Sequence, residues 1–171
     1  SKDSINHKTN HKHLGTIKCS NLCAEIAIYF NITEYAVCTL ANINLSKFIY
    51  NGEFNYQQLI SVAGRVCDNL NRVIDINHYP CKEAKISTMK HRPIGIGVQG
   101  LADVFMILKI PFESDKARYI NKKIFECIYY GALKASCDLA ANESSINNGT
   151  YESYEGSPMS KGILQFDMWD N

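Results

Sequence analysis

The sequence predicts a helix-rich chain of the α/β class, and two kinds of hydrophobic pattern support that class. Three stretches repeat apolar residues at the helical period, and residues 35–45 combine β-branched and apolar residues as a buried strand does. The length of 171 residues suits about one domain, and a hydrophobic content of 46% is enough for a core.

The first third of the chain is expected to hold the strand. Residues 1–14 are polar and aperiodic, so we expect a flexible N-terminal segment, followed by a single domain over residues 15–171. Asn31 and Thr33 suit a turn, and residues 35–45 read as a buried strand that continues into a helix. A hairpin about that turn would bring the sulfur atoms of Cys23 and Cys38 near each other, although the register cannot be read from the sequence.

The remaining two thirds are expected to be mainly helical. Residues 55–76 begin with a possible capping box and carry one apolar stripe: Leu59, Val62, Val66, Leu70 and Val73. Residues 100–108 predict a short apolar helix. Residues 114–143 predict a long helix with the apolar face Ala117, Ile120, Ile124, Cys127, Gly131, Ala135 and Leu139. Residues 144–150 read as a polar loop, and residues 154–166 as a loop that leads into a short apolar strand.

Composition argues against several classes of protein. The net charge of +1 and the pI of about 7.6 provide no basic surface for nucleic acid. No apolar run approaches the roughly 20 residues that a membrane span needs. Seven cysteines, an odd number outside any small secreted framework, favour a reducing compartment, so we expect a cytoplasmic protein. The start at Ser1 without a methionine suggests a piece of a longer chain.

Two motifs have a simpler structural explanation. Gly95, Gly97 and Gly100 match the G-x-G-x-x-G dinucleotide fingerprint, but a long helix is expected where that fingerprint requires a second strand with an acidic residue. The glycines are therefore expected to serve a tight strand-to-helix turn. His7, His11 and His13 could hold zinc, but no cysteine pair supports them, so we expect surface histidines and no metal site.

Most cysteines also suit a structural role. Cys67, Cys127 and Cys137 fall on or beside apolar helical faces, where a thiol behaves as a small hydrophobic group. Cys19 and Cys23 have a spacing that makes a poor zinc site without a second pair, and Cys81 is uninformative.

The stretch around Asn21, Cys23 and Glu25 is the most specific one chemically. In an extended chain these three side chains would share one face, which would align an amide, a thiol and a carboxylate. On spacing alone, a strand with a polar-flanked thiol remains the favoured interpretation. A Cys–His hydrolase is the functional rival, but neither His78 nor His91 lies in a suitable signature.

Several long blocks of the sequence resemble one family. The blocks include LGTIKCSNLCAEI, AVCTLANINL, HRPIGIGVQGLADVF and YESYEGSPMSKGILQFDMW. They are similar to the middle of the large, catalytic subunit of class I ribonucleoside-diphosphate reductases of the eukaryotic type, from about Lys2 to Trp169. The resemblance implies that the chain is a partial segment of a ten-stranded α/β barrel, with the reactive cysteine on an internal loop.

The resemblance also implies a role for each residue of the stretch. Cys23 would become a thiyl radical that abstracts the 3′-hydrogen of the ribonucleotide, and Glu25 would accept the proton of the 3′-hydroxyl. Asn21 would bind the substrate and orient that carboxylate. Cys38 would be one half of a redox pair whose other cysteine lies outside this chain.

The implied cofactors and partners belong to the whole enzyme. This segment would bind no cofactor or metal itself, whereas the enzyme would use a metal-generated radical from a small subunit, ATP and dNTP effectors, and a thioredoxin or glutaredoxin reductant. The large subunit would form a homodimer that acts on ribonucleoside diphosphates. Two rival hypotheses remain for the chain in isolation: a non-catalytic helical module that self-associates through apolar surface, and a thiol-linked metal or redox module.

Overall fold

The computed structural model describes residues 2–21, 24, 26–141 and 149–169, and these residues form two compact units. The first unit comprises residues 1–39, 74–93 and 150–171, and the second comprises residues 40–73 and 94–149. Each unit is therefore assembled from segments that are far apart in the sequence. Among the described residues, no helix combines the length and the apolar character that crossing a membrane requires.

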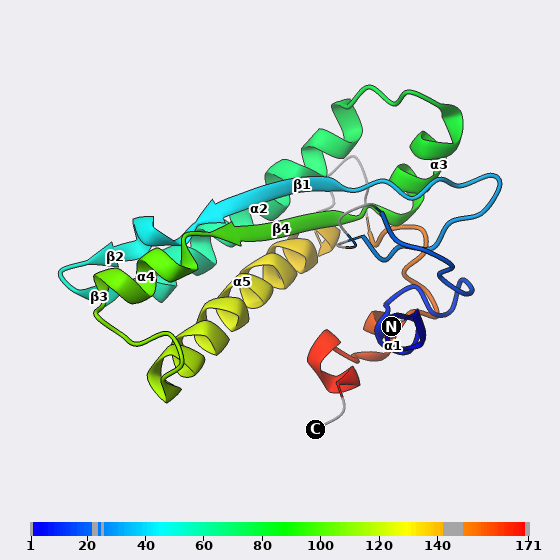
Figure 1. Cartoon of the computed structure of the whole chain (residues 1–171). Coiled ribbons are helices and arrows are strands. Elements are labelled where there is room, and N and C mark those ends of the chain that lie inside the picture. The colour runs from blue at the N-terminus through cyan, green and yellow to red at the C-terminus, as the bar shows by residue number, and fades with distance from the viewer. Residues whose placement is uncertain (1, 22–23, 25, 142–148, 170–171) are drawn as a thin grey trace. The chain divides into compact units, whose positions relative to one another are not determined.

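Two paired strands form the centre of the second unit. Strand β1 (Thr39–Asn44) lies beside strand β4 (Ile94–Gln99), and the two run in the same direction (Figure 1). Residues 35–38 precede the strand, which begins four residues later than predicted. The helix expected after it is only the short 3-10 turn η1 (Leu45–Phe48), where Asn44 Oδ1 accepts a hydrogen bond from the Ser46 amide at 3.2 Å.

A small hairpin follows η1, and the sequence interpretation missed it. Strands β2 (Ile49–Tyr50) and β3 (Glu53–Phe54) are antiparallel. They are joined by Asn51 and Gly52, whose φ angles of 51° and 80° are those of a tight two-residue hairpin turn. The Asn-Gly pair is the signal that could have predicted it, because both turn positions require a positive φ.

The first long helix is confirmed, but its buried face matches the predicted stripe only in part. Helix α2 (Tyr56–Ile76) begins where Asn55 Oδ1 accepts a hydrogen bond from the Gln58 amide at 2.9 Å. Val73 is 37% exposed, and Val62 and Val66 are only partly buried. Leu59 and Leu70 of the predicted stripe are buried, and the rest of the buried face is Ala63, Cys67 and Ile74. Ala63 and Cys67 were overlooked because the stripe was chosen for its large apolar side chains.

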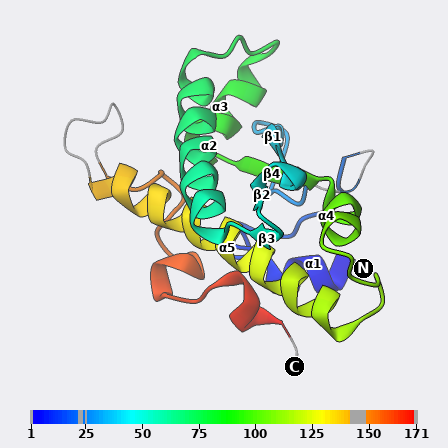
Figure 2. The same cartoon turned by 90° about the vertical axis from the view of Figure 1, so that its left-hand side faces the viewer.

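The two later helices are also confirmed. Helix α4 (Leu101–Ile107) and helix α5 (Asp115–Ala141) follow β4, and Ser114 Oγ accepts a hydrogen bond from the Ala117 amide at the start of α5. The predicted face of α5 is buried from Ala117 to Gly131. Cys137 is exposed, so its expected place on an apolar face is wrong. Figure 2 shows α2 and α5 crossing beside the strand pair.

The core of the second unit joins these elements. It includes Ile43 and Leu45 from β1 and η1, Leu59 and Ala63 from α2, Val104 and Phe105 from α4, and Ile120 and Ile124 from α5. Full burial of each large aliphatic side chain contributes about 1.5–3 kcal/mol to the free energy of folding. The strands are therefore held mainly by the helices that pack on them.

The first unit differs most from expectation. Residues 1–14 were predicted to lack regular structure, but Lys2–Lys8 form helix α1, which lies beside the C-terminal turn η3 (Gln165–Met168) in both views (Figures 1 and 2). Asn10 Oδ1 accepts a hydrogen bond from the Met159 amide at 3.0 Å. This bond joins the N-terminal segment to the C-terminal segment that contains Met159.

Two further elements of the first unit correct the sequence interpretation. Helix α3 (Lys82–His91) was not predicted, because it has almost no amphipathic pattern. The apolar strand expected near residues 163–166 is wrong, since the described residues there form the 3-10 turns η2 (Met159–Lys161) and η3. Both differences arise because contacts between distant segments override local pattern.

Candidate active site

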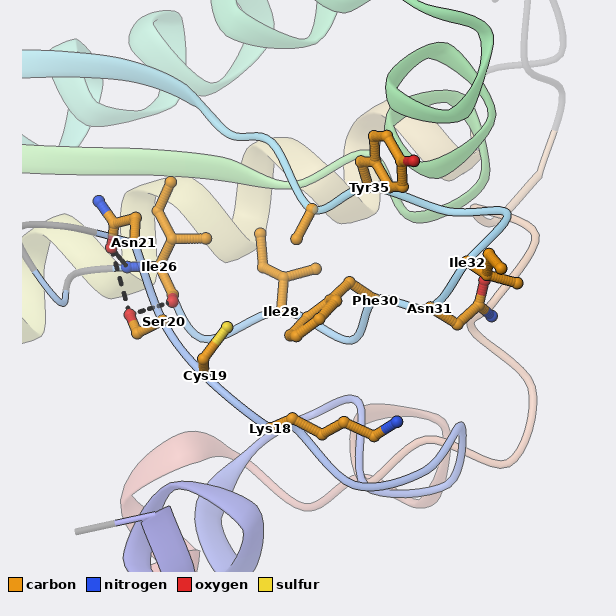
Figure 3. Close-up of a pocket in the computed structure, with 11 residues that line it drawn as sticks. Lys18, Cys19, Ser20, Asn21, Ile26, Ile28, Phe30, Asn31, Ile32 and Tyr35 are labelled. Atoms are coloured by element: carbon orange, nitrogen blue, oxygen red, sulfur yellow. Dashed lines mark hydrogen bonds between the residues drawn. The ribbon is translucent and has the colours of Figure 1, made fainter.

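A cavity of about 520 Å³ lies in the first unit, along the stretch that the sequence singles out. Figure 3 shows two neighbouring segments of chain lining it, residues 18–21 on one side and residues 26–36 on the other. The apolar part of the lining includes Ile26, Ile28 and Phe30, and the polar part includes Lys18, Asn21 and Asn31. The cavity thus combines an apolar wall with a few polar groups, as small-molecule sites commonly do.

Asn21 closes a tight loop at one end of this cavity. Its Oδ1 atom accepts hydrogen bonds from the Ile26 amide at 2.9 Å and from Ser20 Oγ at 3.2 Å (Figure 3). The Asn21 carbonyl accepts one from the Ala24 amide at 3.1 Å, and Ala24 has a φ of 63°. Ala24 is therefore not in the extended conformation. The predicted alignment of Asn21, Cys23 and Glu25 on one face stays a prediction, because Cys23 and Glu25 lie outside the described residues.

Two of the four predicted site residues, Cys23 and Glu25, lie outside the described residues. The predicted proximity of Cys23 to Cys38 stays a prediction. Cys38 itself is half-buried directly before β1, and its Sγ atom donates to the Thr39 carbonyl at 3.7 Å. Ala36, two residues earlier, lines the cavity, so Cys38 follows its wall directly in the chain.

A buried charged network, which the sequence interpretation missed, lies behind this wall. Glu34 is 7% exposed and His91 3%, and His91 Nε2 lies 2.8 Å from Glu34 Oε2. Lys90 Nζ donates to the other carboxylate oxygen at 2.7 Å. Ser153 Oγ lies 2.8 Å from His91 Nδ1. No local signal could have found this network, because Glu34, the Lys90–His91 pair and Ser153 are more than 50 residues apart in the sequence.

Burial and neighbouring charges determine the protonation states of His91 and Glu34. Burial lowers the pKa of His91 more strongly than its bonds to Glu34 raise it, so the imidazole is neutral near pH 7. Burial tends to raise the pKa of Glu34, but the hydrogen bonds and charges of Lys90 and His91 lower it overall. The Nε2–H of neutral His91 then donates to Glu34, and Nδ1 accepts the Ser153 hydroxyl proton.

All three histidines of the N-terminal segment were predicted to lie on the surface, and this prediction is wrong for two of them. His11 packs its ring 4.9 Å from that of His91, and its Nδ1 accepts a hydrogen bond from the Tyr29 amide at 3.2 Å. His13 Nε2 lies 2.9 Å from the Ser153 carbonyl. These two residues are half-buried in the first unit, whereas His7 is exposed. Within the described part of the chain, no group of three His, Cys, Asp or Glu residues is placed to hold a metal ion.

The remaining motifs have structural roles. Gly100 begins α4 with a φ of 77°, and a Cβ atom at Gly97 would lie within 2.3 Å of Asn42 Oδ1. The glycines thus serve a strand-to-helix turn and close packing, as predicted, and α5 is the next regular element after α4. Cys67 and Cys127 are buried as predicted, and burial raises the pKa of each thiol.

Comparison with known proteins identifies the class to which this barrel segment belongs. Residues 1–171 match the family described as "Ribonucleotide reductase, barrel domain". The chain therefore belongs to the ribonucleotide reductase barrel-domain family, and its paired parallel strands with packed helices are part of that α/β barrel.

The relatives are named after one enzyme. The chain is 56% identical over 169 residues to the "Ribonucleoside-diphosphate reductase large chain" of Schizosaccharomyces pombe. It is 56% and 54% identical to proteins named "Ribonucleoside-diphosphate reductase large subunit" from Plasmodium falciparum and Danio rerio. In each case 99% of this chain is covered, but the chain spans only about a fifth (20% or 21%) of the relative's length.

Proposed function

We propose that the protein containing this chain is the large subunit of a cytoplasmic ribonucleoside-diphosphate reductase, which converts ribonucleoside diphosphates to 2′-deoxyribonucleoside diphosphates. The observation that carries the proposal is the identity of 54–56% over nearly the whole chain to relatives with that name. In this proposal a small subunit supplies the radical, nucleotide effectors regulate the large-subunit homodimer, and a thioredoxin or glutaredoxin restores the thiols.

Cys23 is proposed as the thiyl radical. The S–H bond of a thiol is close in strength to an activated ribose C–H bond, so hydrogen transfer between sulfur and the 3′-carbon can run in both directions. Hydrogen transfer requires the neutral thiol, and an apolar environment favours that form because it raises the thiol pKa. The apolar cavity wall of Ile26, Ile28 and Phe30, which follows Cys23 in the chain, supports this assignment.

Glu25 and Asn21 are proposed to act on the sugar hydroxyls. Glu25 would accept the 3′-hydroxyl proton as a general base. Because Asn21 Oδ1 already holds the loop closed at Ile26, its Nδ2 group is the part of the side chain that would donate to substrate.

Cys38 is proposed as one thiol of the redox pair. The 2′-hydroxyl leaves as water, and two electrons come from Cys38 and a second cysteine outside this chain, which join in a disulfide as both lose their hydrogen atoms. Its half-buried position directly after the cavity wall supports this role.

The proposal is tested by substituting the radical cysteine in the full-length enzyme, assayed with its small subunit and a dithiol. Cys23→Ser is expected to abolish deoxynucleotide formation, because a serine O–H bond is too strong to take part. Cys137→Ser, at an exposed thiol on α5, is the matched control and should retain activity. Deoxynucleotide formation by Cys23→Ser at the unsubstituted rate would refute the proposal.

A further inference from the structure

We propose that Glu34 and His91 are positioning residues, whose buried pair fixes the 31–36 wall of the cavity and the backbone that leads from it to Cys38. The proposal deepens the proposed function and rests on it for the redox role of Cys38. The anchoring itself is a property of the first unit and can be measured without any reductase activity.

The wall is closed locally and then attached to α3. Asn31 Oδ1 accepts hydrogen bonds from the Thr33 amide at 2.7 Å and from the Glu34 amide at 3.0 Å, which makes a compact turn. The Asn31 amide donates to the Glu34 carbonyl at 2.9 Å. The next residue, Tyr35, donates its amide to the Glu83 carbonyl of α3 at 3.3 Å. These bonds shape the turn, but only one backbone bond among them joins it to α3.

The Glu34 carboxylate supplies the stronger attachment. It bonds to Lys90 and His91 at the end of α3, and hydrogen bonds to a charged group are stronger than those between neutral groups. His91 is held in turn by Ser153, whose own amide donates to the Lys90 carbonyl at 3.4 Å. Three segments that are distant in the sequence are therefore joined, Glu34 to the end of α3 and the end of α3 to Ser153.

The charge balance favours this attachment. Glu34 and Lys90 carry one charge of each sign, and His91 is neutral, so the cluster is balanced only when the carboxylate stays in place. A turn that moved away would leave the buried Nε2–H of His91 without its acceptor. Leaving a buried polar group unpaired is unfavourable, because the group has lost its hydrogen bonds to water.

Ser153, His91 and Glu34 are hydrogen-bonded in the order of a hydrolase triad, Ser–His–Glu. Their burial argues against nucleophilic catalysis. Ser153 is 5% exposed, and neither Ser153 nor His91 lines the cavity. A nucleophile needs access to a substrate carbonyl. The network therefore has a structural role, which is to hold the 31–36 wall of the cavity in position.

Cys38 is four residues beyond this anchor and directly precedes β1. Four residues of extended chain reach at most about 14 Å, so an anchor at Glu34 limits where the thiol can move. A redox thiol must meet a partner sulfur with Cβ atoms about 4 Å apart. A loose approach to Cys38 would therefore slow disulfide formation.

The test measures native-state alkylation of Cys38 with iodoacetamide in the full-length protein, read by peptide mass spectrometry. Glu34→Gln is expected to raise the Cys38 rate by about tenfold or more, the equivalent of losing about 1.4 kcal/mol of local anchoring. Asp138→Asn removes a carboxylate from an exposed ion pair with Lys134 and is the matched control, with no change expected. Ser153→Ala is a milder second variant, expected to raise the rate about threefold, if Glu34→Gln does not fold.

Two buried thiols distinguish local loosening from general unfolding. Cys67 and Cys127, which lie 4% and 8% exposed in the second unit, should keep their alkylation rates in Glu34→Gln. An unchanged Cys38 rate, or an equal rise at all three cysteines, would overturn the proposal.

The catalytic consequence is measured separately. In the full-length enzyme, Glu34→Gln is expected to lower kcat by about tenfold and to leave KM within about twofold, because the substrate-binding groups are unchanged. An unchanged kcat would overturn the positioning role. If the unsubstituted enzyme has no reductase activity, the proposed function is refuted. The alkylation rates of Cys38 would still test whether Glu34 anchors the cavity wall.

Discussion

Gly131 of α5 lies so close to the Ile60 carbonyl of α2 that a Cβ atom at residue 131 would be 2.5 Å from that oxygen. It would also be 3.1 Å from the Ala63 side chain. Both contacts involve groups that cannot move aside without shifting a helix. The close crossing of α2 and α5, which forms much of the core of the second unit, therefore depends on glycine at this position.

Gly131→Ala is expected to destabilise this crossing by about 1–3 kcal/mol through overpacking, despite the higher helix propensity of alanine. Hydrogen–deuterium exchange of the α2 and α5 peptides in the full-length protein should accelerate accordingly. The matched control is Gly64→Ala, where the added Cβ atom would meet the Gly131 carbonyl at 3.4 Å, an ordinary contact. That variant should exchange no faster than the unsubstituted protein, and equal acceleration in both would contradict the account of the crossing.

Asn21 allows its two hydrogen-bonding roles to be separated. Asn21→Asp keeps an oxygen acceptor for the Ile26 amide but loses the Nδ2 donor, whereas Asn21→Ala loses both. We expect Asn21→Asp to preserve hydrogen-exchange protection of the Ile26 amide and to raise KM by about tenfold, the loss of roughly one hydrogen bond. Asn21→Ala should lose the protection as well. If Asn21→Asp keeps a normal KM, Nδ2 does not bind substrate.

Acid should weaken the first unit through its buried histidines. Burial, followed by the charges of His91 and His13, lowers the pKa of His11 from 6.5 to about 4, with Glu34 opposing. As the pH falls, His11 therefore binds a proton near pH 6.5 in the unfolded chain but only near pH 4 in the folded chain. Stability is full above pH 6.5 and falls as the pH drops toward 4, by at most about 3 kcal/mol for this group.

His91 and Glu34 also contribute to the pH dependence of stability. His91 also has a lowered pKa and adds to the loss, while Lys90 and Glu152 are the charged groups that face it besides Glu34. The pKa of Glu34 is lowered, so its contribution is present above its unfolded pKa and is lost at still lower pH. The thermal midpoint of the full-length protein, measured between pH 7.5 and 4.5, should fall less steeply for His11→Gln. His78→Gln, at an exposed histidine, should keep the original slope.

The 171-residue chain by itself is expected to show no reductase activity. It contains Cys38 but, by the family resemblance, not the second thiol of the redox pair, so the electrons for loss of the 2′-hydroxyl have no complete source. The measurement is deoxynucleotide formation by the purified chain with a small subunit and a dithiol. Multiple turnovers would contradict the assigned redox pair.

The sequence by itself determined the features that depend on neighbouring residues. Asn55 and Ser114 start α2 and α5 because their side chains accept hydrogen bonds from amides three residues later. The buried face of α5 followed from its apolar period, and the turn at Gly100 from its glycine. The linear blocks that resemble ribonucleotide reductases also needed no structure, since they depend on residue order alone.

Only the tertiary structure decided which residues meet across long distances in the chain. Glu34 lies 57 residues from His91, and His91 lies 62 residues from Ser153, so no local pattern links them. The polar segment Lys2–Lys8 forms α1 beside the C-terminal turns, although it has no apolar period of its own. The physical reason is that burial and charge pairing act through space, whereas propensity and capping act along the chain.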